Sequence, residues 1–239
     1  MKSFRTTSIL LLSLYAAILF EANEEHDTTV SAVLPTFTET RAQVPAGEGD
    51  VTETETMNVL DQISQRISEG YVYAANMSHR FTDGFTMEET ETTGEVWVGT
   101  ERYKVRTSDQ LISVDGRVST VFNIQQNKVL ISNYHPEEDD FAPSRFIGSY
   151  QERFEISGIE EHEGGITRVH LQSVDPFEII TVASLDIDPA GPHLIQMYAE
   201  DQTDNIYEIS FTNGRFESGI DEVFTISWPN TAEVIDLRE

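Results

Sequence analysis

The sequence contains no cysteine and few basic residues. Without cysteine, the 239-residue chain can form no disulfide, no thiolate nucleophile, no Cys-bound metal or iron–sulfur site and no lipid anchor on an N-terminal cysteine. Lys and Arg together number 15 against 42 Asp and Glu, which gives a formal net charge of −27. A surface this negative repels phosphate backbones and anionic lipid headgroups, so we expect no nucleic-acid binding. Hydrophobic residues still make up 38% of the chain, enough for a folded core.

The sequence also lacks an apolar run long enough to span a bilayer as a helix. The apolar stretch of residues 8–20 (SILLLSLYAAILF) would extend only about 20 Å, whereas a bilayer core is about 30 Å thick. Lys2 and Arg5 precede it, which is typical of a secretory signal peptide. We therefore predict a signal peptide over residues 1–22 and export to the periplasm. An uncleaved signal anchor is the alternative.

Residues 23–55 show no helical or strand periodicity. They are rich in Thr, Glu, Pro, Ala and Gly, and such a segment buries too little apolar surface to offset the entropy of ordering it. We expect a disordered acidic Thr/Pro-rich linker here, followed by one folded domain over residues 56–239.

The folded domain is expected to begin with one amphipathic helix over Met57–Glu69. Its apolar residues Val59, Leu60, Ile63 and Ile67 fall on one helical face, and Gly70 can end it. Short runs with strand-like alternation follow, separated by turn sequences such as Asp-Gly, Gly-Gly and Asn-Gly. The predicted strands cover residues 71–81, 95–98, 103–106, 110–114, 118–122, 128–132, 149–155, 167–171, 178–185, 193–199, 205–212 and 223–228.

This succession predicts a mainly β (α+β) fold built on a sequential antiparallel sheet. No alternation of strands and helices is visible, which argues against a doubly wound α/β enzyme. One interruption, residues 134–147, contains Pro136 and Pro143 with carboxylates between them. Both prolines suit a first helical turn, so we predict a short helical excursion that packs back on the sheet.

The sequence offers no catalytic or metal-binding constellation. It lacks G-x-S-x-G, H-E-x-x-H, a Walker A motif and G-x-G-x-x-G. The carboxylates of residues 137–140 lack the alternating spacing of a calcium loop. We therefore expect no enzyme activity, no cofactor and no metal.

Several segments in a fixed order resemble the LolA family of periplasmic outer-membrane lipoprotein carriers. They are Gly94–Val98 (GEVWV), Tyr103–Val105 (YKV), Gln110–Gly116 (QLISVDG), Pro136–Pro143 (PEEDDFAP) and Phe224–Pro229 (FTISWP). The resemblance implies an unclosed antiparallel β half-barrel with an α-helical lid and a cavity that accepts the acyl chains of lipoproteins. It also implies cargo received from an inner-membrane ABC-type exporter, delivery to an outer-membrane receptor, and a monomeric protein.

Candidate residues for the acyl-chain cavity follow from that resemblance and from the apolar positions. Those in the sheet are Phe81, Val96, Val98, Tyr103, Val105, Phe122 and Ile131, and those under the lid are Leu60, Ile63, Ile67, Phe146 and Ile147. The family's lid-holding basic residue follows the Trp-containing strand, where Arg102 is the nearest candidate. The alternative function is a periplasmic or membrane-tethered module that senses lipids or lipoproteins on the same fold.

Overall fold

The computed structural model describes residues 53–139, 142–147, 150–188, 190–191, 193–218 and 221–238. The predicted signal peptide and residues 23–52 of the predicted linker lie outside these ranges, as does Phe141 of the predicted helical excursion. Within them, no helix is long and apolar enough to cross a membrane.

One long helix and twelve strands make up most of the described structure. The helices are α2 (Glu53–Ser68) and α3 (Pro143–Ile147), with short 3-10 turns η1 (Pro136–Glu138), η2 (Tyr150–Glu152) and η3 (Asp221–Phe224). The strands are β1 (Tyr71–Thr82), β2 (Glu89–Val98), β3 (Tyr103–Thr107), β4 (Gln110–Val114), β5 (Val118–Asn123), β6 (Lys128–Asn133), β7 (Phe154–Glu161), β8 (Thr167–Ser173), β9 (Ile180–Asp188), β10 (His193–Asp201), β11 (Ile206–Ser218) and β12 (Glu233–Asp236).

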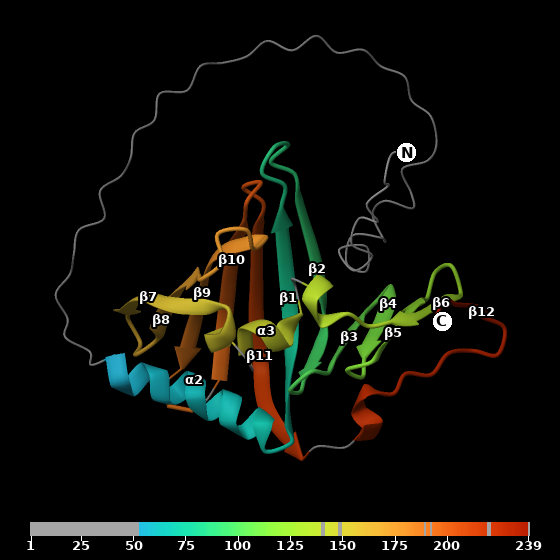
Figure 1. Ribbon diagram of the computed structural model, residues 1–239, viewed down its shortest axis with the longest axis horizontal. Coiled ribbons are helices and arrows are strands. Elements are labelled where there is room, and N and C mark those ends of the chain that lie inside the picture. The colour runs from blue at the N-terminus through green and yellow to red at the C-terminus, as the bar shows by residue number, and fades with distance from the viewer. Residues whose placement is uncertain are drawn as a thin grey trace, which may run out of the picture.

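All twelve strands form one unclosed sheet in the order β12-β6-β5-β4-β3-β2-β1-β11-β10-β9-β8-β7 (Figure 1). Strands β1 to β6 are consecutive antiparallel neighbours, and so are β7 to β11. The two meanders join at the centre, where β1 pairs with β11 from Tyr71↔Ser218 to Thr82↔Ile206. The expected mainly β, unclosed antiparallel sheet is therefore confirmed.

Two connections must cross the sheet because of this strand order. The link from β6 to β7 starts near one edge and ends at the other, and it carries η1, α3 and η2 across one face. Helix α2 packs on β1 and on α3. The link from β11 to β12 crosses on the opposite face, where Lys104 Nζ donates to the carbonyl of Val223 (3.0 Å) and Ser113 Oγ donates to that of Phe224.

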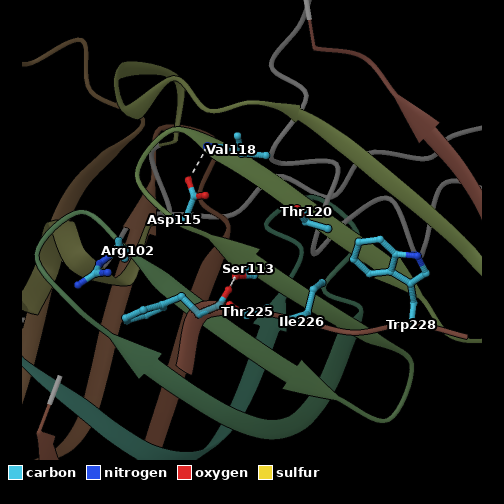
Figure 2. A pocket seen from close by; sticks show the side chains of 9 residues that line it. Arg102, Ser113, Asp115, Val118, Thr120, Thr225, Ile226 and Trp228 are labelled. Carbon is cyan, nitrogen blue, oxygen red and sulfur yellow. Dashed lines mark hydrogen bonds between the residues drawn. The ribbon is translucent and has the colours of Figure 1, made fainter. Parts of the chain in front are cut away.

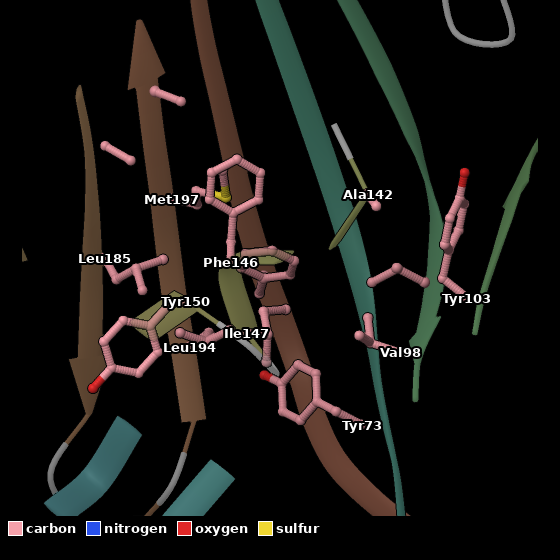
Figure 3. Packing of buried hydrophobic residues seen from close by; sticks show 14 of the residues in the cluster. Tyr73, Val98, Tyr103, Ala142, Phe146, Ile147, Tyr150, Leu185, Leu194 and Met197 are labelled. Atoms are coloured by element: carbon pink, nitrogen blue, oxygen red, sulfur yellow. The ribbon is translucent and has the colours of Figure 1, made fainter. Parts of the chain in front are cut away.

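Each crossing covers its own apolar layer. The larger layer lies under α2 and α3 and includes Tyr73, Val98, Tyr103, Phe146 and Ile147 (Figure 3). The smaller layer consists of Phe122, Val129 and Ile226, with Leu111, Ile131, Trp228 and Ala232 packed against them. Strands β4 and β5 therefore contribute apolar side chains to both faces of the sheet.

Several predicted boundaries differ from the structure. Helix α2 begins at Glu53 rather than Met57 and so takes in the end of the predicted linker. The strand predicted over residues 149–155 overlaps the observed β7 only at residues 154–155, because η2 occupies residues 150–152 and β7 begins at Phe154. The Asn213-Gly214 turn is wrong: β11 continues through it, and the extra residue forms a bulge opposite Ala74–Asn76.

The end of the chain departs furthest from the prediction. Residues 223–228 were expected to be a strand, but they form the end of η3 and an irregular extended segment. The chain then forms β12, which pairs with β6 in parallel, from Glu233↔Lys128 to Asp236↔Ile131. A crossover makes this parallel pairing possible, which a purely sequential sheet would exclude.

Candidate functional site

The structure gathers ten of the twelve candidate cavity residues in one buried layer between the sheet and the two helices. Each is at most 7% exposed, so their side chains pack on one another in this state. Figure 3 labels four of them, Phe146 and Ile147 on α3 and Val98 and Tyr103 on β2 and β3. The ten are Leu60, Ile63, Ile67, Phe81, Val96, Val98, Tyr103, Val105, Phe146 and Ile147.

The other two candidates, Phe122 and Ile131, lie on the opposite face. Their neighbours there are Ile226 and Trp228 of the C-terminal crossing. Successive residues of a strand point to opposite faces, and Val121, next to Phe122, packs on the helix-covered layer instead. A ligand under the helices would therefore contact Val121 rather than Phe122.

Individual polar contacts hold the helices in place. Ser64 Oγ of α2 donates to the carbonyl of Ile147 in α3 (3.0 Å), and Thr100 Oγ1 donates to the carbonyl of Ile67 (3.3 Å). These bonds supplement apolar packing, which is the main term holding a short helix on a sheet. Helix α3 has only five residues, so its position depends on such contacts.

A buried carboxylate joins the crossing link to the sheet. Asp139, 4% exposed, accepts a hydrogen bond from Tyr103 Oη of β3 (2.8 Å). Burial raises the pKa of Tyr103, and the negative charge of Asp139 raises it further. Burial and the same carboxylate raise the pKa of Tyr134, whereas the Arg145 guanidinium opposes that shift. Both phenols therefore stay protonated and can donate to the carboxylate.

These four residues, Tyr103, Tyr134, Asp139 and Arg145, which we call the Asp139 cluster, join β3 to the crossing link and to α3. Arg145 belongs to α3, and its Nη2 donates to the carbonyl of Pro136 in η1 (2.5 Å). The sequence analysis considered Asp139 only as one of the carboxylates of residues 137–140 and gave it no role. The one usable signal was the proximity of that run to two prolines and apolar residues.

Arg102, the candidate lid residue, lies on the other face. Its guanidinium stands 4.9 Å from the ring centroid of Phe224 in η3. The alternation of side chains along a strand explains this placement. Tyr103, the first residue of β3, points to the helix-covered layer, and Arg102 immediately before it points to the opposite face. This contact therefore joins Arg102 to the C-terminal crossing.

Arg102 also lines a cavity of about 370 Å³ between β4, β5 and that crossing (Figure 2). The lining mixes charged, hydroxyl and aromatic side chains, so it does not resemble an acyl-chain site. Asp115 is engaged locally, since it accepts hydrogen bonds from the backbone of Arg117 (2.9 Å) and Val118 (2.8 Å). The remaining lining residues are Ser113, Val118, Thr120, Phe224, Thr225, Ile226 and Trp228.

His79 is a buried titratable group on β1. It is stacked on Tyr207 of β11, with ring centroids 6.2 Å apart and planes 12° apart. Burial lowers the pKa of His79 to about 4, so the imidazole is neutral at neutral pH. Among the described residues, no group of three or more His, Asp or Glu side chains is arranged to hold a metal ion.

No protein-family model matches the sequence, and neither does any curated protein. Solved structures do resemble the fold. An uncharacterized conserved protein from Thermus thermophilus matches with a TM-score of 0.49 at 10% identity, over 76% of this chain and 98% of that chain. A LolA superfamily protein from Nitrosomonas europaea matches with a TM-score of 0.40 at 11% identity, over 71% and 97%.

A putative outer membrane lipoprotein-sorting protein domain from Vibrio parahaemolyticus matches with a TM-score of 0.39 at 11% identity, over 70% of this chain and 94% of that chain. These likenesses are distant and structural, and they are unaccompanied by a sequence-level family assignment. They concern only the fold of the backbone, and a function has to be argued from the residues of the candidate site.

Proposed function

We propose that the protein is a periplasmic carrier that binds the acyl chains of lipoproteins between its sheet and helices α2 and α3. The observation that carries this proposal is the single buried layer formed by ten candidate residues, whose cover consists of separate helical pieces. A layer closed by short helices can open by moving them, whereas a layer closed by a second sheet cannot open so easily.

The free energy of exposing a lipid anchor to water explains why a carrier needs such an apolar layer. Exposing an acyl chain to water costs about 0.8 kcal/mol per CH₂, so two or three chains of about 16 carbons cost tens of kcal/mol. Displaced helices would offer the chains matching apolar surface. Transfer to a receptor then requires only that the receptor binds the chains more tightly.

The proposed partners follow from that role. The carrier would take acylated cargo from an inner-membrane ABC-type exporter, pass it to an outer-membrane receptor, and act as a monomer without enzymatic activity. The alternative is a lipid- or lipoprotein-sensing module, tethered by an uncleaved residue 8–20 segment. Mass spectrometry of the mature N-terminus separates the two, because only a cleaved protein diffuses freely between membranes.

Binding can be tested with the full chain and a fluorescent fatty acid as probe. We expect saturable binding that a diacylated lipopeptide displaces and its deacylated form does not. The variant Phe146→Ala, which opens space beneath α3, should change probe affinity. Ile131→Ala removes an apolar side chain on the opposite face and should leave the affinity unchanged.

Carrier function is tested by incubating the protein with spheroplasts. A carrier releases membrane-bound lipoproteins into solution as a one-to-one complex, whereas a sensing module binds the lipopeptide without releasing cargo. A protein that never takes up the fatty acid, even when α3 is loosened, contradicts the proposal.

A further inference from the structure

Three loops at one end of the sheet are tied together by hydrogen bonds. The β1–β2 loop (residues 83–88) meets the β10–β11 loop (residues 202–205), where the backbone N–H of Gly84 donates to Asn205 Oδ1 (2.9 Å). The β10–β11 loop in turn meets the β8–β9 loop (residues 174–179), because Gln202 Nε2 donates to the carbonyls of Pro176 (3.2 Å) and Glu178 (2.7 Å). The β10–β11 loop therefore lies between the other two.

The contact between the first two loops is tight. A Cβ atom added to Gly84 would lie 2.5 Å from the backbone of Asp204. At the end of β10, Asp201 accepts hydrogen bonds from Thr203 Oγ1 (2.7 Å), from the backbone of Thr203 (2.8 Å) and from Asn205 Nδ2 (2.9 Å). Although burial opposes its ionisation, these bonds lower the pKa of Asp201, which keeps the loop fixed by a charged acceptor.

These fixed loops expose large apolar side chains. Phe85 is 95% exposed, Phe177 87%, Met87 68% and Val174 51%. We call these four residues the tip surface. The tips of β1–β2 and β10–β11 stand at the top of Figure 1, at the other end of the sheet from α2. Exposed aromatic side chains on rigid loops are characteristic of binding surfaces, because little entropy is lost when they are covered.

Negative charge predominates around the tip surface. The basic residue beside it, Arg153, accepts a hydrogen bond from the backbone N–H of Val174 at its carbonyl, and its guanidinium is paired with Glu178 of the β8–β9 loop. Glu88, Glu89, Asp175 and Asp204 are exposed in or beside the three loops. The loops themselves contain no Lys, Arg or His. The apolar side chains are thus surrounded by carboxylates, and a partner must supply both apolar contact and positive charge.

We propose that the tip surface docks a protein partner that presents a cationic amphipathic segment. Its apolar face would cover Phe85 and Phe177, and its basic residues would meet the surrounding carboxylates. The site is separate from the helix-covered layer, so a docked partner would leave α2 and α3 free to move.

The charge also argues against two other occupants. A second copy of this chain would bring the same carboxylates and a further −27 of formal charge against the surface. A bilayer would have to accept four exposed carboxylates near its phosphates to reach Phe85 and Phe177. A cationic protein segment meets neither repulsion.

The probe for this proposal is a synthetic amphipathic helix of leucine and lysine, titrated into the full chain. A serine–lysine peptide of equal charge measures the purely electrostatic part. We expect the double variant Phe85→Ser/Phe177→Ser to bind the leucine–lysine helix at least about tenfold more weakly, with the serine–lysine peptide unaffected. Leu237→Ser, at another exposed apolar residue near the C-terminus, is the matched control and should bind like the wild type.

The charge contribution is tested with Glu88→Gln/Glu89→Gln, which should weaken binding and flatten its salt dependence. Two results would overturn the proposal. One is equal affinity of the Phe85→Ser/Phe177→Ser variant and the wild type for the leucine–lysine helix. The other is Phe85-dependent binding to phosphatidylcholine vesicles without binding to the helix, which would identify a membrane as the occupant.

Discussion

Replacing Tyr103 by phenylalanine removes one hydroxyl from the helix-covered layer and keeps the ring. The hydroxyl donates to Asp139, which is almost fully buried, over 2.8 Å. A hydrogen bond to a charged acceptor contributes about 1.5–3 kcal/mol, so the variant should lose about that much free energy of unfolding. For a domain of this size, the melting temperature should fall by roughly 3–12 °C.

If α2 and α3 cover the acyl-chain site as proposed, Tyr103→Phe should also loosen that cover. Because Asp139 precedes α3 on the crossing link, losing its bond to β3 should speed uptake of the fluorescent fatty acid in stopped-flow measurements. Ser113→Ala is the matched control, since it deletes a buried hydroxyl on the opposite face. It should lower stability without changing the uptake rate. Unchanged stability and unchanged uptake in Tyr103→Phe would refute the proposal that the Asp139 cluster fastens the crossing link and α3 to the sheet.

Three other substitutions give direct tests. Between about pH 7 and pH 4, the unfolding free energy of the wild type should fall about 3 kcal/mol more than that of His79→Phe. The reason is that the imidazole has a pKa of about 6.5 in the unfolded chain and gains a proton there, whereas burial lowers its pKa to about 4 in the folded protein. An equal pH dependence of the unfolding free energy in the two proteins would contradict this. Gly94→Ala should lower the free energy of unfolding in urea by about 1–3 kcal/mol, because the new Cβ would lie 2.1 Å from a carbonyl oxygen of β3. Gly158→Ala should lower it less, because the nearest atom to its Cβ would be 3.7 Å away. Arg102→Ala should lower the free energy of unfolding by about 0.5–1 kcal/mol, because the contact with the Phe224 ring is lost, and should leave the rate of fatty-acid uptake unchanged. Faster uptake would instead support the predicted lid role of Arg102.

Local periodicity was enough to find most elements of the sheet. The spacing of Leu60, Ile63 and Ile67 predicted the buried face of α2, and all three are buried in the structure. The β4 prediction, Gln110–Val114, agrees with the observed bounds. These successes share a cause, since each element is specified by residues close together in the chain.

The failures come from long-range pairing. Residues 223–228 contain Val, Phe, Ile and Trp, which favour strands, yet side-chain donors Lys104 and Ser113 bind their carbonyls in place of a ladder. Consecutive apolar residues such as Val121 and Phe122 give no indication of which one faces the helices. That choice depends on the crossing that covers each face, which local sequence does not encode.

The central seam between β1 and β11 has a consequence for how the chain acquires its structure. Residues 71–82 pair on one side with residues 206–218, so the middle of the sheet cannot form until residue 218 has been synthesised. Each meander can assemble from near neighbours, but each then carries a long unpaired edge. Closing that seam brings together segments separated by most of the domain, which should make it the slow step of refolding and the stage most exposed to aggregation.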